Sequence, residues 1–374
     1  MRGLEACRSD VQNTERNGRA LILKIAFRVD ANSEIGTGHV MRCLTLAKGI
    51  QNMLDASDIL HSITFVNSQE STLLQERYGP CNLNHEVVKQ IDSNVEHVDA
   101  DLWIVDHYQL DETFEQKLSL TGAKVMVIDD LANRPHYCDL LLDVNFSDRV
   151  NRYETLVPPK CKMLLGPEYA LLRQEFYEQP TVDFIKRDPV RVLVCFGGSD
   201  PANMTSLTLD SIASIKDVQL QVDIVIGSGH QTKRVVIEKV NQITQITEHN
   251  IRLHIDSDQI AKLMQKASLM VGAGGSMHWE RCISMLPALV VCVAENQVET
   301  TRCLSKENVC RYLGFWDQVS VTDLARALVF LLQSPSTLQA MSECAGSIVP
   351  RHCGTPCVTK HVLSLLKPLP LQQA

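Results

Sequence analysis

Apolar, β-branched segments alternate with segments of helical spacing along almost the whole chain. Strands that alternate with helices are typical of a parallel sheet that is covered on both faces. The sequence therefore predicts an α/β fold. In the first half, the strand-like segments are 24–29, 61–67, 101–108, 123–129 and 138–144, and the helix-like segments are 43–50, 71–78 and 111–121.

This alternation is interrupted at 151–189, which contains five prolines and no long periodic run. A second series begins with the strand-like segment 191–196, which runs into Gly197 and Gly198 and a helix from about residue 203. Further strands are predicted at 222–226, 251–255, 269–272 and 288–293, and helices at 321–333 and 355–366. We therefore expect an N-terminal extension at 1–23, a first domain at 24–165 and a second domain at 166–374.

Composition limits the classes of function that remain. The 374 residues can form two domain cores, and 45% hydrophobic with 21% charged residues is typical of a globular protein. The net charge of -8 argues against a general nucleic-acid surface, and no apolar run reaches the roughly 18 residues of a membrane span. Residues 1–19 lack the apolar segment of a signal peptide.

The 13 cysteines are scattered and include no C-x-x-C pair, which predicts free, mostly buried thiols in a reducing cytoplasm. No recognisable spacing of metal ligands is present either. We therefore expect a cytoplasmic protein without a metal or cofactor, and nothing in the sequence implies a protein partner.

The segment 35–42 (IGTGHVMR) places a glycine loop and a histidine between the first strand and the first helix. Gly38 lets a ligand approach the backbone closely, and a helix N-terminus favours an anion. His39 can accept a proton near neutral pH, although a histidine at a helix start often only caps or packs. Arg42, one turn into the helix, is unfavourable to the helix dipole unless it has an anionic partner.

Several aspartates at the ends of predicted strands could orient His39, hold a substrate or merely cap the next element. Spacing does not choose among Asp30, Asp106, Asp129 and Asp130. His107 and Tyr108 follow one of these strands and could form a wall of the same site, because ligands of such sheets bind outside the carboxyl ends of the strands.

The second half repeats the order of strand, glycine loop and helix at 269–282. Gly274 and Gly275 free the approach to the first helical turn, where a diphosphate could accept backbone N–H bonds, and Ser276 is a candidate N-cap. Glu280 lies four residues later, on the same helical face, and could accept hydrogen bonds from ribose hydroxyls. The alternative is a tight turn with a surface glutamate. The pattern is neither a Walker loop nor G-x-G-x-x-G.

Two amides, Asn296 and Gln297, follow the next predicted strand. Paired amide donors and acceptors can recognise sugar hydroxyls or N-acetyl groups, but amides are also common in ordinary loops.

Six segments in unbroken order resemble one enzyme family, the UDP-2,4-diacetamido-2,4,6-trideoxy-β-L-altropyranose hydrolases of pseudaminic acid biosynthesis, with related spore-coat polysaccharide proteins. The segments are RVDANSEIGTGHVMRCLTLA, DLWIVDHYQLDETFE, VIDDLANRPHYCDLLLDVN, LLGPEYALLRQEF, VLVCFGGSDPANMT and GAGGSMHWERCISMLPALVVCVAENQ. The resemblance covers about 24–314. It departs at Met277 and His278, where members often carry hydroxyl residues, and at 348–354, which replaces an Asp-Gly segment.

The resemblance implies a GT-B fold, in which two Rossmann-like domains face a central cleft. It implies hydrolysis of a UDP-sugar with inversion, with His39 as the base that activates water and UDP as the leaving group. By position, Tyr108 and Asn296 would line the sugar site, the Gly274–Ser276 loop would hold the diphosphate and Glu280 the ribose. Gly38, Arg42 and Gln297 complete the expected substrate site. Two alternatives stay open: a GT-B glycosyltransferase that uses a UDP-sugar donor, and a non-catalytic nucleotide-sugar binding protein.

Overall fold

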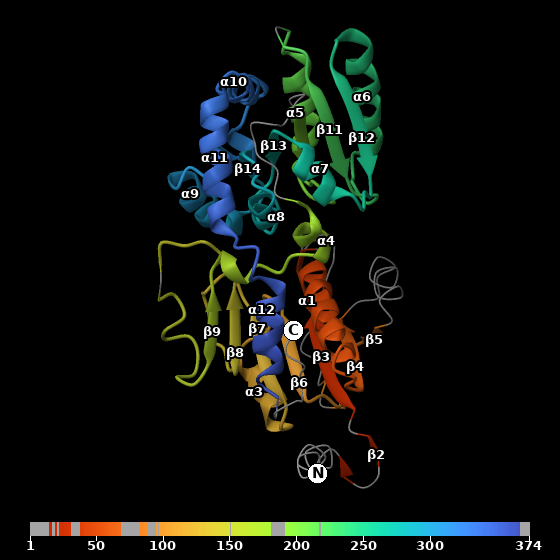
Figure 1. Cartoon of the computed structure of the whole chain (residues 1–374), viewed down its shortest axis with the longest axis vertical. Coiled ribbons are helices and arrows are strands. Elements are labelled where there is room, and N and C mark those ends of the chain that lie inside the picture. The colour runs from red at the N-terminus through yellow and green to blue at the C-terminus, as the bar shows by residue number, and fades with distance from the viewer. Residues whose placement is uncertain are drawn as a thin grey trace, which may run out of the picture.

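The computed structural model describes residues 22–30, 38–68, 83–88, 95, 97–149, 151–180, 191–216 and 218–366, together with the antiparallel strand pair β1 (Glu15–Arg16) and β2 (Arg19–Ala20). Two parallel sheets, each with helices on both faces, lie one above the other along the long axis of the molecule (Figure 1). The predicted helix at 71–78 lies outside the described residues. No helix in the described ranges is long and apolar enough to cross a membrane.

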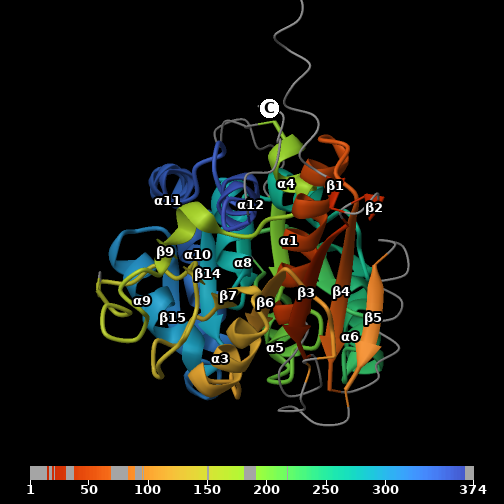
Figure 2. The same cartoon turned by 90° about the horizontal axis from the view of Figure 1, so that it is seen from below.

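The described part of the first sheet has seven strands in the order β5-β4-β3-β6-β7-β8-β9, all parallel. Helix α1 packs with α12 on one face, and α3 covers the other (Figure 2). The strands are Leu23–Val29 (β3), His61–Asn67 (β4), Asn84–Val87 (β5), Leu102–Asp106 (β6), Lys124–Ile128 (β7), Leu140–Asp143 (β8) and Lys162–Leu165 (β9). The helices are Gly38–Asp55 (α1), Glu112–Leu120 (α3) and Thr355–Leu363 (α12).

The second sheet has six described strands in the order β12-β11-β10-β13-β14-β15, also parallel. Helices α5, α6 and α10 pack on one face, and α4, α7 and α8 on the other. The strands are Arg191–Cys195 (β10), Gln221–Ile226 (β11), Asn250–Ile255 (β12), Leu269–Gly272 (β13), Ala288–Cys292 (β14) and Arg311–Phe315 (β15). The helices are Gln174–Glu178 (α4), Met204–Ala213 (α5), Lys233–Ile246 (α6), Ile260–Lys266 (α7), Met277–Ile283 (α8), Val298–Lys306 (α9), Val321–Leu332 (α10) and Pro335–Ile348 (α11).

The predicted α/β class with two parallel sheets is confirmed, and the strands missed from the sequence lie at sheet edges. Strand β9 starts with the exposed Lys162 and Met163, and β15 with the exposed Arg311. Because an edge strand is only partly covered, it needs no continuous apolar run. Helix α11 was missed as well.

The last helix of the chain returns to the first domain. In α12, Val358, Val362 and Leu363 are buried in one core with residues of α1 and β3. The contact is close, because a Cβ on Gly49 of α1 would lie 2.8 Å from the Thr359 hydroxyl oxygen. The limits 24–165 and 166–374 stay a prediction, but the chain after about 354 packs on the first sheet.

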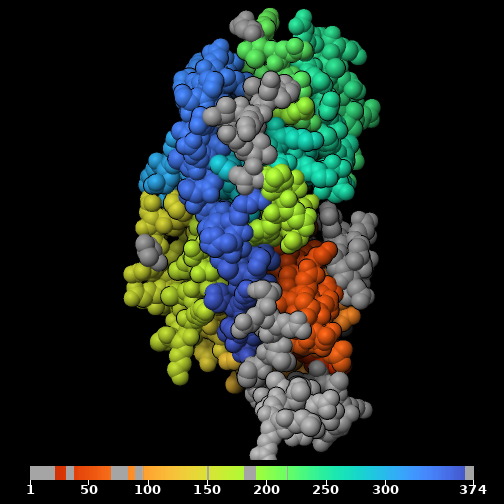
Figure 3. All heavy atoms as spheres, in the orientation of Figure 1, coloured from red at the N-terminus to blue at the C-terminus, as the bar shows by residue number. Residues whose placement is uncertain are grey.

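The two chain crossings between the domains run side by side, as the adjoining lime and blue surfaces of Figure 3 show. The forward crossing contains the short helix η2 (Pro167–Tyr169) and α4, and the return crossing leads from α11 to α12. Leu172 and Thr355 exchange two hydrogen bonds of 2.8 and 2.9 Å, and the Gly354 N–H donates to the Glu168 carbonyl at 2.7 Å. These bonds tie the two crossings together at the boundary of the domains.

Candidate active site

Buried aspartates line the edge of the first sheet that faces the second domain. Parallel strands bring their carboxyl ends to one edge, so residues far apart in sequence meet there. A buried carboxylate needs a compensating cation, and each of these aspartates forms an ion pair with a different arginine. The pairs are Asp30 with Arg28, Asp106 with Arg42, Asp129 with Arg134 and Asp143 with Arg152.

Among these aspartates, Asp106 is the one bonded to the predicted base. His39 lies in the first turn of α1, and its Nδ1 is 2.6 Å from Oδ1 of Asp106. Asp106 is fully buried and His39 is 7% exposed. A carboxylate that accepts a hydrogen bond from Nδ1–H leaves the lone pair on Nε2 as the basic site. Within the described residues, no group forms a hydrogen bond with Nε2.

Arg42 binds both oxygens of the same carboxylate. Its Nε donates to Oδ2 of Asp106 and its Nη2 to Oδ1, both at 2.6 Å, and Nη1 lies 3.4 Å from Asp130. Asp106 is thus the anionic partner that Arg42 requires at its position near the start of the helix. Burial alone would raise the pKa of Asp106, but Arg42 and His39 outweigh it and hold this pKa well below its usual range. The carboxylate therefore stays ionised.

Tyr108 packs its ring edge-on against the His39 ring, with 4.6 Å between ring centroids. Its hydroxyl donates to Asp130 at 3.2 Å and accepts a hydrogen bond of 3.1 Å from Nδ2 of Asn296, which belongs to the other domain. Burial and the charge of Asp130 raise the pKa of Tyr108, so its phenol stays neutral. The sequence-predicted residues His39, Arg42, Tyr108 and Asn296 thus meet in one place.

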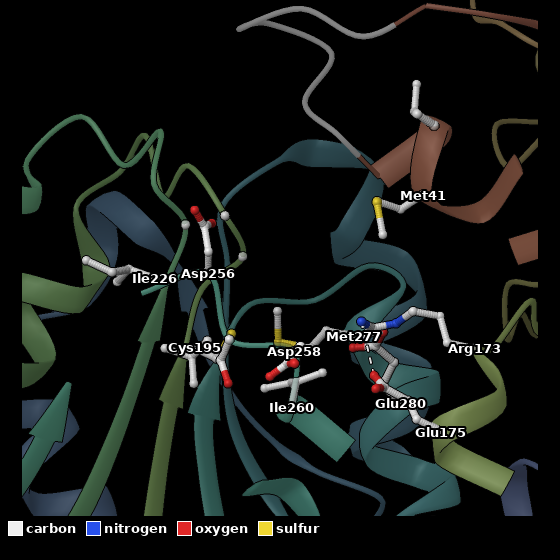
Figure 4. A pocket seen from close by; sticks show the side chains of 16 residues that line it. Met41, Arg173, Glu175, Cys195, Ile226, Asp256, Asp258, Ile260, Met277 and Glu280 are labelled. Atoms are coloured by element: carbon white, nitrogen blue, oxygen red, sulfur yellow. Dashed lines mark hydrogen bonds and ion pairs between the residues drawn. The ribbon is translucent and has the colours of Figure 1, made fainter. Parts of the chain in front are cut away.

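A cavity of about 340 Å³ lies between the domains beside this group. Val40 and Met41, the residues after His39, line it from the first domain (Figure 4). The second domain lines it with residues from the ends of β10, β11 and β12 and from the starts of α7 and α8, namely Cys195, Gly197, Gly198, Val225, Ile226, Gly227, Asp256, Ser257, Asp258, Ile260, Met277 and Glu280. Arg173 and Glu175, from the chain crossing, complete the lining.

Glu280 lines this cavity and pairs with Arg173, a residue that the sequence did not single out. Arg173 Nη2 donates to Oε1 of Glu280 at 3.2 Å, as the dashed line in Figure 4 shows, and Arg173 also lies 3.0 Å from Glu175. Burial raises the pKa of Glu280, and Arg173 opposes this shift. Of the described lining residues Arg173 alone is a cation, beside four carboxylates. The only signal in the sequence was its place in the segment LLGPEYALLRQEF.

The glycine loop before α8 contains a backbone conformation that favours glycine. Gly275 has φ +78°, and a Cβ on Gly274 would lie 3.0 Å from the Gln297 Cβ. Gln297 also accepts a hydrogen bond of 3.1 Å from the Val293 N–H. Its side chain therefore packs against the glycine loop and is fixed in place by this bond. Ser276 is the N-cap residue of α8, as predicted, but its side chain makes no capping hydrogen bond and the residue is exposed. The loop ends at Ser276, immediately before Met277, which lines the cavity.

His278 belongs to the core instead of the cavity. Its Nδ1 accepts from Arg281 at 3.0 Å, and its Nε2 lies 2.9 Å from the Thr301 hydroxyl. Burial and Arg281 hold the pKa of His278 well below its usual range, so the ring is neutral. Gly38 begins α1, and among the described residues, its chain neighbours aside, no heavy atom would lie within 4 Å of a Cβ there. The rest of the predicted loop, 35–37, lies outside the described residues.

Two parallel-sheet α/β domains that join around such a cavity define the GT-B fold, which this chain has. MurG of Acinetobacter baumannii superimposes with a TM-score of 0.63 at 13% identity, over 92% of this chain and 99% of that one. Anabaena HepE in complex with UDP-glucose gives 0.57 at 12% identity, over 93% and 100% of the two chains. The model of the glycosyltransferase family 28 C-terminal domain matches residues 192–352.

Two curated proteins are similar over most of the chain. The UDP-2,4-diacetamido-2,4,6-trideoxy-β-L-altropyranose hydrolase of Campylobacter jejuni is 29% identical over 286 residues, which is 76% of this chain and 97% of that protein. The spore coat polysaccharide biosynthesis protein SpsG of Bacillus subtilis is 25% identical over 306 residues, 79% of this chain and 85% of that protein.

Proposed function

We propose that this protein hydrolyses a UDP-linked 2,4-diacetamido-2,4,6-trideoxyhexose to UDP and the free sugar. Water would attack the anomeric carbon with inversion, and His39 would act as the general base. The contact between His39 Nδ1 and Asp106 carries this proposal, because it turns the basic Nε2 of a buried imidazole away from its carboxylate partner. The similarity to the Campylobacter hydrolase over nearly its full length supports the substrate class.

Asp106 and Arg42 would act on His39 instead of on the substrate. When Nε2 takes a proton from water, the imidazolium gains the adjacent carboxylate as a counter-ion. Arg42 bonds to both oxygens of Asp106 and therefore fixes the carboxylate in the orientation that this needs. Arg42, a predicted substrate residue, would thus position the base.

The leaving group would lie on the side of the second domain. A nucleoside diphosphate is anionic, and Arg173 is the one cation among the described residues that line the cavity. The backbone N–H groups at Gly274, Gly275 and Ser276 would add donors to the diphosphate, and Glu280 would accept hydrogen bonds from the ribose hydroxyls. UDP is a good leaving group, so no strong general acid is required. Charge that develops on the diphosphate needs only fixed donors and a cation.

The sugar would lie between Tyr108 and Asn296, the polar groups that meet beside His39. While Nδ2 of Asn296 keeps its bond to Tyr108, the second N–H and the carbonyl oxygen of the same amide could bond to acetamido groups. Gly38, which precedes His39, would let the substrate approach the start of α1 closely, and Gln297 would hold Asn296 near Gly275.

A glycosyltransferase is the second candidate, favoured by the match of residues 192–352 to a glycosyltransferase C-terminal domain. In that case His39 would activate an acceptor hydroxyl in place of water. The two reactions differ in whether UDP release requires an acceptor.

The decisive experiment follows the UDP-linked 2,4-diacetamido-trideoxy-altrose by phosphorus and proton NMR in water labelled with heavy oxygen. We expect UDP release without an acceptor, inverted sugar as the first product and the label on the sugar. UDP-N-acetylglucosamine is the control substrate and should stay intact.

His39→Ala should abolish turnover while the affinity for UDP stays within a few-fold. Release that needs an added sugar acceptor would favour the transferase. UDP binding without turnover in either form would favour the binding protein.

A further inference from the structure

Two cysteines from adjacent strands of the first sheet form a close pair that the proposed reaction does not use. Cys138 precedes β8 and Cys161 precedes β9, and their Sγ atoms are 3.6 Å apart. The backbones are already joined here, since the Lys162 N–H donates to the Asp139 carbonyl at 2.9 Å. A small change of side-chain rotamer therefore brings the sulfurs within bonding distance without a movement of the strands.

The two thiols differ in exposure and in acidity. Such a difference is expected between a thiol that attacks a disulfide and the second thiol that then displaces the bound group. Cys138 is 6% exposed and belongs to a core cluster, whereas Cys161 is half-buried and packs at the border of that cluster. The hydrogen bond between the two thiols lowers the pKa of Cys161, although burial and the charge of Asp139 oppose this, and His136 adds to the lowering. The same bond and burial raise the pKa of Cys138. The accessible sulfur is thus the better thiolate.

His136 supplies a positive charge near this pair. Its Nδ1 lies 2.8 Å from Glu115, and its Nε2 is 3.6 Å from Asp129. Burial would lower the pKa of His136, but these two carboxylates raise it to about 9. The ring is therefore an imidazolium at neutral pH.

We propose that Cys138 and Cys161 are a redox-active dithiol that reacts with low-molecular-weight disulfides and closes to an intramolecular disulfide. The Cys161 thiolate attacks one sulfur of the small disulfide, forms a mixed disulfide and releases one small thiolate. Cys138 then loses its proton, attacks Sγ of Cys161 and expels the second small thiolate, which takes up the proton. Two protein thiols are oxidised, and one small disulfide is reduced to two thiols.

The pair is remote from the candidate active site but lies at the two ends of a segment that contacts the second domain. Both cysteines lie before the amino ends of parallel strands, whereas Asp106 ends its strand at the opposite edge. The disulfide would close the segment 139–160. From this segment Ser147 donates to Glu299 of α9 at 3.1 Å, and Asp148 pairs with Lys306 at 2.8 Å. Oxidation would therefore restrict the loop that touches the second domain.

The test treats the full chain with oxidised glutathione and follows intact mass and peptide maps. We expect a loss of two hydrogens, a Cys138–Cys161 cross-linked peptide and a higher melting temperature than the reduced protein. In Cys138→Ser, the reaction should stop at one glutathione on Cys161. In Cys161→Ser, Cys138 should stay unmodified. Before oxidation, alkylation of Cys161 should be more than about tenfold faster than that of Cys138.

Two results would overturn the proposal. One is a stable glutathione adduct on Cys161 of the unsubstituted chain, which would mean that Cys138 cannot reach it. The other is modification confined to other cysteines, such as Cys353 or Cys357, while 138 and 161 remain reduced. Neither result bears on UDP release, so the outcome is separate from that of the proposed hydrolysis.

Discussion

Asn296 Nδ2 donates a hydrogen bond of 3.1 Å to the hydroxyl of Tyr108, and this bond joins the second domain to the residue that packs against His39. Asn296 of the second domain thus contacts Tyr108, and Tyr108 packs against His39, the proposed base in the first domain. The arrangement of the domains and the environment of His39 are therefore coupled.

Loss of this bond should lower catalytic efficiency. We expect Asn296→Ala and Tyr108→Phe each to reduce kcat/KM by about tenfold, the equivalent of one hydrogen bond between neutral groups. Because both variants remove the same interaction, the double variant should lose little more than either single one, as steady-state kinetics would show. Glu299→Gln, which changes another contact between the domains, is the control. Fully additive losses would mean that the two residues act separately.

Removal of the carboxylate beside His39 should suppress turnover. In Asp106→Asn the amide keeps the shape, but the counter-ion of the imidazolium is lost and Arg42 loses its main partner. We expect kcat to fall by about a thousandfold or more, with UDP affinity within a few-fold by calorimetry. Asp143→Asn, at the end of β8, two strands away in the same sheet, should change kcat little. An equal loss in both variants would indicate general damage to this edge of the sheet.

Arg173 and Glu280 should contribute to different parts of the nucleotide. Arg173→Gln should weaken UDP binding about tenfold while uridine affinity changes little, since only UDP carries the diphosphate. Glu280→Gln should weaken both ligands, because both contain the ribose. Calorimetric titration with the two ligands measures the difference, and Arg173→Lys, which keeps the charge, should bind UDP better than Arg173→Gln. If Arg173→Gln weakens both ligands equally, the arginine only orients Glu280.

Stability should fall as pH rises because of His136. Its pKa is raised to about 9 in the folded chain, above the ordinary value of 6.5. The stabilisation is therefore fully present below about pH 6.5 and is lost as pH rises through 9, and it amounts to at most about 3 kcal/mol. Urea unfolding at pH values on both sides of this window would measure the fall. His136→Gln should be less stable at the lower pH and should show a smaller fall; an unchanged slope would exclude His136 as its source.

Gly354 should not tolerate a side chain. It has φ +70°, and a Cβ there would lie 2.1 Å from the Tyr177 hydroxyl oxygen and 2.9 Å from the Ala170 carbonyl oxygen. We expect Gly354→Ala to lower the free energy of unfolding by at least about 2 kcal/mol, because the turn into α12 must shift. Gly229→Ala has open space and an ordinary φ, so its melting temperature should match that of the unsubstituted chain. Equal melting temperatures for both variants would contradict the close packing at Gly354.

The sequence predicted the central strands of both sheets well, because a strand buried on both faces must be continuously apolar. Strand β13, which is buried throughout, was predicted with the observed bounds, Leu269–Gly272. The edge strands β9 and β15 lack that pattern, since solvent covers part of them. The fold class could therefore be predicted from the sequence, but the number of strands in each sheet could not.

For the candidate site, the sequence singled out His39 from its place between a glycine loop and a helix, and Glu280 from its spacing after a second loop. It could not choose among Asp30, Asp106, Asp129 and Asp130, because all of them end strands in the same manner. It also left Arg173 unnoticed, since an arginine in a proline-rich connection carries no local pattern.

The sequence by itself determined the alternation of central strands, glycine loops and helices, because apolar periodicity and glycine positions depend on neighbouring residues. Only the tertiary structure decided that Asp106 holds His39, that Arg173 faces the cavity beside Glu280, and that α12 returns to the first domain. These relationships join residues 67, 107 and more than 300 positions apart. They arise from the lateral order of parallel strands and from the path of the chain between the domains, and neither is encoded in a local pattern.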